Sequence, residues 1–194
     1  MKKIVWIVCL ATAVAVVACN DSGSQGDSVQ NADDSNAVKA RSDSMAMQVD
    51  KNAADFAVQA ADAGMKEVAL GQLAQVKGVD KRVKSFGEMM VNDHTLANDK
   101  LRSLAAQKNI TLPDSLSNDA KKEIGDLQKK NGRDFDKAYV GMMENGHKKV
   151  VDDFRKASQD LSDAELKTFA TETLPTLQKH LDSITVISKA LKGK

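Results

Sequence analysis

The chain has 194 residues, and its 28 basic side chains are nearly balanced by 27 acidic ones, which gives a formal charge of +1. This balance provides no strong electrostatic field of the kind that attracts nucleic acid, so a nucleic-acid partner is not expected. Two cysteines are present, too few for a disulfide framework.

The first 18 residues have the pattern of a bacterial lipoprotein signal peptide. Lys2 and Lys3 form a positive start, and the apolar run that follows is short for a transmembrane helix. The end of this run, Val16-Val17-Ala18-Cys19, resembles a lipobox. We expect cleavage before Cys19, lipidation of Cys19 and a membrane-anchored protein of the bacterial cell envelope, on the periplasmic side or at the outer membrane. An ordinary cleaved signal with Cys19 incidental is the alternative.

Cleavage would change the charge and the cysteine content of the chain. Loss of Lys2 and Lys3 leaves 26 basic against 27 acidic residues, a formal charge of −1. The segment that follows, residues 20–51, is rich in Asn, Asp, Ser, Gln and Gly and has no aromatic residue. Such a segment cannot bury enough apolar surface to offset its ordering entropy. We therefore predict a disordered tether over residues 19–51.

Residues 52–191 have the size of one domain and the composition of an all-helical one. Proline occurs only at Pro113 and Pro175, and helix-forming residues dominate. The expected long helices span about residues 52–77, 80–108, 134–158 and, after the capping box Ser162-Asp163-Ala164-Glu165, the stretch to 191. A short extra helix near 117–130 lies in the long connection between the second and third. The prediction is an all-α four-helix bundle with a long crossover.

The three histidines fall on three different long helices, and Glu67 falls on the fourth. Glu67, His94, His147 and His180 each lie on the apolar stripe of their helix, so we expect them in the core. If the long connection retraces the bundle, as in ferritin-like folds, all four lie roughly 17 to 21 Å from the same end. Plain up-down connections would put His180 about 10 Å out of level. The spacing therefore favours the crossover and a single cluster.

Two interpretations of this cluster remain open. Imidazole and carboxylate groups suit iron, zinc, manganese or copper, so the first is a metal site with one or two ions, in a metal-binding envelope protein. The second is a buried polar network in which Glu67 pairs with a histidine and Tyr139 or Asp93 satisfies the rest. The protein would then be a non-catalytic envelope scaffold or interaction module.

Further polar residues could act around the cluster. Asp93 and Asp136 are candidates to orient imidazole rings or, alternatively, are solvated surface residues. Glu144 has the Glu-x-x-His spacing with His147, and no other histidine has such a partner. Di-iron bundles use four carboxylates with two such pairs, so a ferroxidase centre is not favoured.

Two methionines lie near the predicted cluster. Met90 and Met143 each precede a histidine by four residues, and thioether with imidazole would suit Cu(I). Methionine as a filler of irregular core space is the favoured alternative. The sequence shows no Gly-rich phosphate loop and no convincing pair of nucleophile and base, so we assign no catalytic residue.

Four sequence blocks resemble a known family. They are Glu67-Val-Ala-Leu-Gly-Gln-Leu-Ala, Met90-Val-Asn-Asp-His94-Thr, Phe135-Asp-Lys-Ala-Tyr139 and Leu174-Pro-Thr-Leu-Gln-Lys-His180-Leu. In this order they resemble the bacterial domain of unknown function family 4142, over about residues 52–191. The resemblance implies an exported, ferritin-like helical bundle, often described as an outer membrane protein, with no established activity. On matching positions the family's polar pattern falls on Glu67, Asp93, His94, Asp136, Tyr139, His147 and His180.

Overall fold

The computed structural model describes residues 26–41 and 49–192, and this part of the chain is helical without strands. Its helices are α1 (Ser28–Ala40), α2 (Lys51–Lys77), α3 (Lys81–Gln107), α4 (Asn118–Gln128), α5 (Gly132–Asp160) and α6 (Ala164–Lys192). The predicted all-α class is therefore confirmed. The predicted signal peptide, residues 1–18, and the predicted lipidation site Cys19 lie outside the described residues. Within the described residues no helix combines the length and apolar character required to cross a membrane.

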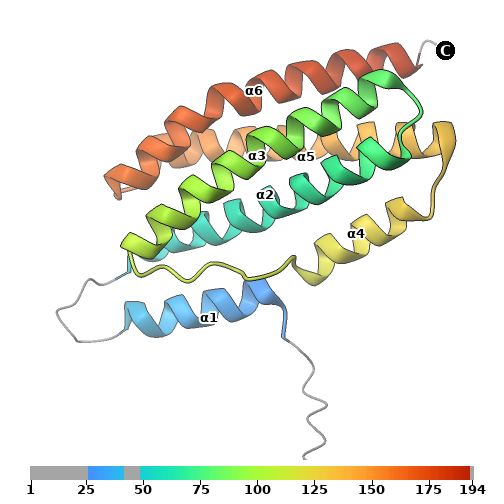
Figure 1. Cartoon of the computed structure of the whole chain (residues 1–194). Coiled ribbons are helices and arrows are strands. Elements are labelled where there is room, and N and C mark those ends of the chain that lie inside the picture. The colour runs from blue at the N-terminus through green and yellow to red at the C-terminus, as the bar shows by residue number, and fades with distance from the viewer. Residues whose placement is uncertain (1–25, 42–48, 193–194) are drawn as a thin grey trace, which may run out of the picture.

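The four long helices form two antiparallel hairpins, α2 with α3 and α5 with α6 (Figure 1). The hairpins pack together through α3 against α6 and α2 against α5. The connection between them, residues 108–131, contains α4 and runs back along the bundle, so that α3 and α5 begin at the same end (Figure 1). Helices α1 and α4 lie outside this bundle, against α2.

A polar layer divides the core into two apolar clusters. One cluster lies towards the start of α2 and includes Ala61, Leu101, Val151 and Leu177; the other includes Leu70, Met90, Met143 and Ile184. Each of the four long helices contributes one of these residues to each cluster. Between its two residues, each helix also carries one buried polar residue. These four residues are Glu67, His94, His147 and His180.

The tether prediction for residues 19–51 is wrong for Ser28–Ala40, which form α1. Asn36 is buried there: its Oδ1 accepts from the backbone N–H of Thr111 at 2.7 Å, and its Nδ2 donates to the Thr111 carbonyl at 2.9 Å. Ser28 donates to Asp114 at 2.8 Å. Hydrogen bonds to the crossover thus hold the helix in place. The prediction of a disordered tether considered only the burial of apolar surface, so it did not include these bonds.

Candidate metal centre

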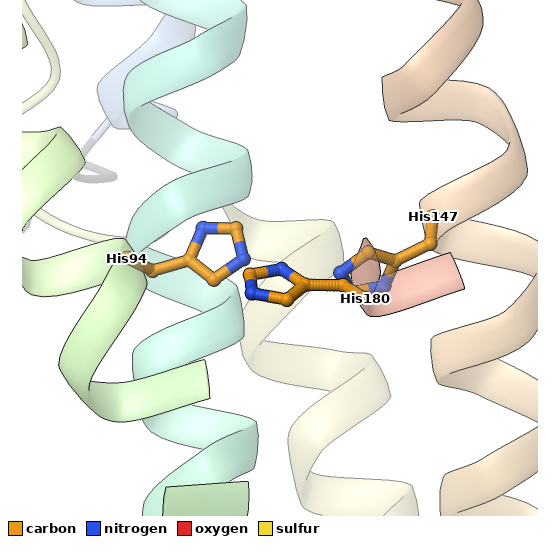
Figure 2. A group of neighbouring side chains, drawn as sticks. All are labelled: His94, His147 and His180. Atoms are coloured by element: carbon orange, nitrogen blue, oxygen red, sulfur yellow. The ribbon is translucent and has the colours of Figure 1, made fainter. Parts of the chain in front are cut away.

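Three imidazole rings converge in the core: His94 from α3, His147 from α5 and His180 from α6 (Figure 2). One ring nitrogen of each lies within 4.8 Å of a ring nitrogen of both others. The rings are 7%, 1% and 1% exposed, so the group is enclosed by protein. The prediction that the three histidines share one level and face inward is confirmed.

Hydrogen bonds fix the orientation of two of these rings. His147 Nδ1 lies 3.0 Å from the Met143 carbonyl oxygen, to which it donates, and this leaves the lone pair on Nε2. His180 Nε2 lies 2.8 Å from Asp93 Oδ2, so that nitrogen donates and the lone pair remains on Nδ1. Histidines that bind metals usually donate their second N–H to a carbonyl or carboxylate in this way.

The nitrogens left over by these bonds have no protein partner. Among the described residues, the fully buried side-chain atoms without a hydrogen bond are His94 Nε2, His147 Nε2, His180 Nδ1, Glu67 Oε2 and Tyr139 OH. Buried polar atoms in proteins nearly always have a partner, and a group of them in one place calls for an explanation. A ligand shared by the three nitrogens would supply it.

Burial keeps the three histidines neutral. It lowers the pKa of His94 to about 3 and that of His147 to about 4, with repulsion among the rings acting in the same direction. For His180 burial also lowers the pKa, against the opposing effect of the Asp93 carboxylate. The neutral ring is the form that offers a lone pair to a metal ion.

Glu67 stands beside the histidines. Its Oε1 lies 3.9 Å from His147 Nδ1, which is too long for a hydrogen bond. Burial raises the pKa of Glu67 to about 8, although Lys66 opposes the shift, so most of the carboxyl groups are protonated at neutral pH. With His147 neutral as well, the two form no ion pair, and Glu67 is a largely neutral acid beside His147.

Two hollows adjoin the cluster. A cavity of about 20 Å³ is lined by Glu67, His94 and His147, with further apolar and small side chains. A larger recess of about 320 Å³ on the α3–α6 side is lined by Asp93, His94 and His180 among others. The inner cavity has room for about one water-sized group.

The structure brings some of the other predicted residues to the cluster and places others elsewhere. Asp93 contacts His180 as described, and Tyr139 is buried with its hydroxyl near Glu67, where desolvation and the carboxyl raise its pKa well above the usual value. Met90 and Met143 lie in the apolar cluster with Leu70.

The predictions for Asp136 and Glu144 are wrong. Asp136 lies eleven residues, or about 16 Å, along α5 from His147, where its oxygens accept from the N–H groups of Val79 and Asp80 in the α2–α3 turn. Glu144 pairs with Lys148 at 2.9 Å and lies beside Ser188 of α6. Neither carboxylate reaches the histidines, because each is held by a partner away from them.

One residue beside the cavity was missed. Asn98 lines it together with Glu67 and His94, and its Oδ1 would lie only 1.9 Å from a Cβ atom added at Gly64. The amide therefore rests against the α2 backbone in the notch that Gly64 leaves. Its position four residues after His94, on the same helical face, was the available signal.

Comparison with known proteins gives a family and nothing more specific. No curated protein and no solved structure matches the chain. The family model described as a domain of unknown function, DUF4142, matches residues 38–187, which is well over half of the 194 residues and includes Glu67 and all three histidines. The chain therefore belongs to the family of this domain of unknown function, DUF4142.

Proposed function

We propose that this protein binds one transition-metal ion through His94, His147 and His180, inside a ferritin-like four-helix bundle. The observation that carries the proposal is a group of three buried histidines that offer one ring nitrogen each within 4.8 Å of one another, each with a buried ring nitrogen that has no partner. In two of the rings the opposite nitrogen is anchored by a protein oxygen, which is the arrangement expected of metal ligands.

The ligand set indicates which ions fit. Three neutral imidazoles suit zinc, copper and iron, whereas manganese prefers carboxylate and water oxygens. Metal–nitrogen bonds of about 2.0–2.1 Å place tetrahedral ligand nitrogens roughly 3.3 Å apart. The rings would therefore approach one another by at most about 1.5 Å on binding. Rotation of the side chains can provide this movement without a rearrangement of the helices.

The same set favours one ion over two. Di-iron bundles use four carboxylates and two histidines. Here no carboxyl oxygen belongs to the group of three ring nitrogens in the described part of the chain, since Asp93 accepts from His180 Nε2 and Glu144 pairs with Lys148. The proposal is therefore a mononuclear site, and we assign no catalytic step to it.

The sequence adds a location. The signal-like residues 1–18 and the lipobox at Cys19 support a lipid-anchored protein of the bacterial cell envelope, periplasmic or at the outer membrane. A lipid-anchored protein with a buried metal site would take up or retain metal ions in the cell envelope.

Metal titration of protein purified without a histidine tag tests the proposal. We expect one Zn(II), Co(II) or Cu(II) per chain in a chelator competition. At a free metal concentration one hundred times Kd, binding stabilises the fold by about 2.7 kcal/mol. For a domain of this size the melting temperature should then rise by about 5–10 °C.

Two variants sharpen the test. His147→Ala should abolish the metal-dependent rise in melting temperature. The matched control is Met90→Leu, a similarly buried change one turn before His94, which should retain it, since the Met90 side chain lies in the apolar cluster. Loss of Cu(I) binding in Met90→Leu would instead support a thioether ligand.

A structural role for the cluster is the competing candidate. It is favoured by the His180–Asp93 hydrogen bond, which joins the two hairpins without any metal. An envelope scaffold of this kind predicts that His147→Ala lowers the melting temperature equally with and without added metal. A failure of every tested ion to bind at micromolar concentration would decide for it.

A further inference from the structure

The cavity of about 20 Å³ beside the histidines has a distinctive lining. It combines small residues of α2 and α3 with bulky apolar side chains. The lining includes Glu67, His94, Asn98, Phe154, Phe169 and Leu177. The volume has room for about one water-sized group.

Polar groups of two further residues meet in this apolar space. Glu67 is 5% exposed, and its Oε2 has no hydrogen-bond partner among the described residues. Asn98 is placed by the notch at Gly64, and no hydrogen bond involves its side chain in the described part of the chain. A polar group that enters the cavity would therefore meet a buried carboxyl oxygen that has no partner and, beside it, the half-buried amide of Asn98.

A metal ion held by three imidazoles has a fourth tetrahedral position to fill. His94 and His147 both line the cavity, so an ion bound to their free nitrogens would border it. Given the metal site proposed above, on which this step rests, we infer that the fourth coordination position opens into this cavity. It takes an exchangeable ligand of one or two heavy atoms, such as water, hydroxide or a diatomic anion, and Glu67 and Asn98 bind that ligand.

The cavity also sets an upper size limit. Phe154, Phe169 and Leu177 belong to the tightly packed apolar cluster, and a ligand with a five-membered ring would have to displace them. We therefore expect the buried ion to accept small ligands and to exclude large ones. A metal ion exposed at the surface would accept both.

The experiment uses the purified full chain loaded with Co(II), whose visible spectrum responds to a change of ligand. Cyanide, with two heavy atoms, and imidazole are titrated separately, and bound cobalt is measured after each titration. We expect cyanide to change the spectrum while cobalt stays bound, and imidazole to leave it unchanged. Asn98→Leu, which keeps the size but removes the amide, should weaken cyanide binding about tenfold, the loss of one hydrogen bond.

Asn92→Leu is the matched control, an exposed asparagine on the same helix, and its cyanide affinity should equal that of the unmodified chain. Co(II) that binds but responds to neither ligand, or equally to both, would overturn this inference and leave the metal site standing. An unchanged cyanide affinity in Asn98→Leu would overturn the role of Asn98. If Co(II) does not bind at all, the metal site itself is overturned and this inference with it.

Discussion

His180 on α6 donates from Nε2 to Oδ2 of Asp93 on α3, across 2.8 Å. The Asp93 side chain is 31% exposed, whereas that of His180 is 1% exposed, so this bond connects the surface to the buried cluster. It also joins the two hairpins of the bundle. Because the bond occupies Nε2, the Nδ1 atom of His180 is the one left for a ligand.

Replacement of Asp93 by alanine should weaken metal binding. Loss of a carboxylate that orients a metal-bound histidine typically costs 10–100-fold in metal affinity, and we expect a loss in this range. Chelator competition with Zn(II) measures it. The control is Asp99→Ala, which removes an exposed aspartate whose ion pair, among the described residues, is with Arg102 three residues away. Equal affinities for the two variants would show that Asp93 does not position His180.

The metal-free protein should be most stable near pH 6.5. His94 and His147 have folded-state pKa values of about 3 and 4, against 6.5 when unfolded. Below pH 6.5 the unfolded chain therefore binds more protons at these positions, and stability falls with decreasing pH. Glu67 acts in the opposite direction: its pKa is about 8 folded and 4.5 unfolded, so its contribution is lost as the pH rises towards 8.

Urea unfolding of the unmodified chain and of Glu67→Gln isolates the alkaline half of this behaviour. The free energy of unfolding of the unmodified chain should fall by about 2 kcal/mol between pH 6.5 and 8. The Gln variant cannot ionise at this position, so it should not show this decrease. The loss of stability in acid should remain in this variant, because the histidines that cause it are unchanged. Parallel stability curves above pH 6.5 would mean that Glu67 is ionised and solvated in the folded protein.

The close contact of α2 with α3 should be sensitive to a single methyl group. A Cβ atom at Gly71 would lie 2.6 Å from the Gly87 carbonyl oxygen, so the backbones must separate to accept it. We expect Gly71→Ala to lower the free energy of unfolding by about 1–3 kcal/mol. Gly141→Ala is the control, because nothing lies within 4 Å of its added methyl group, and it should be stabilising by about 0.5–1 kcal/mol. Urea titration measures both, and an equal effect of the two changes would contradict the close contact.

Docking of α1 should depend on Asn36. Its side chain makes two hydrogen bonds to the Thr111 backbone, and Asn36→Ala removes both, so hydrogen exchange of the α1 amides should rise at least tenfold. Exchange in α2 should stay unchanged. Asn31→Ala, an exposed change on the same helix, serves as control. Unaltered protection of α1 in the Asn36 variant would show that other contacts hold it.

The positions of His94, His147 and His180 could be predicted because two regular properties of helices determine them. A period of 3.6 residues fixes the face, and a rise of 1.5 Å per residue fixes the level, so local sequence was enough once the path of the crossover was inferred. The position of Glu67 beside His147 follows from the same reasoning.

Other features depend on contacts that no local pattern records. Asp136 accepts hydrogen bonds from the N–H groups of Val79 and Asp80, more than fifty residues earlier in the chain. Its local sequence therefore gave no sign that it lies away from the histidines. The polar stretch of α1 looked disordered because its partners lie in a loop some seventy-five residues later. The position of Asn98 beside the cavity depends on its close contact with Gly64 of α2, which the sequence alone does not indicate.

X-ray absorption of the zinc-loaded full chain tests the metal site most directly. We expect one zinc ion per chain, bound by three imidazole nitrogens at about 2.0–2.1 Å and by one further oxygen or nitrogen ligand. His94→Ala, His147→Ala and His180→Ala should each lose the imidazole signal or the bound ion. Zinc that fails to bind, or that binds through oxygen ligands alone, would contradict a metal site at these histidines.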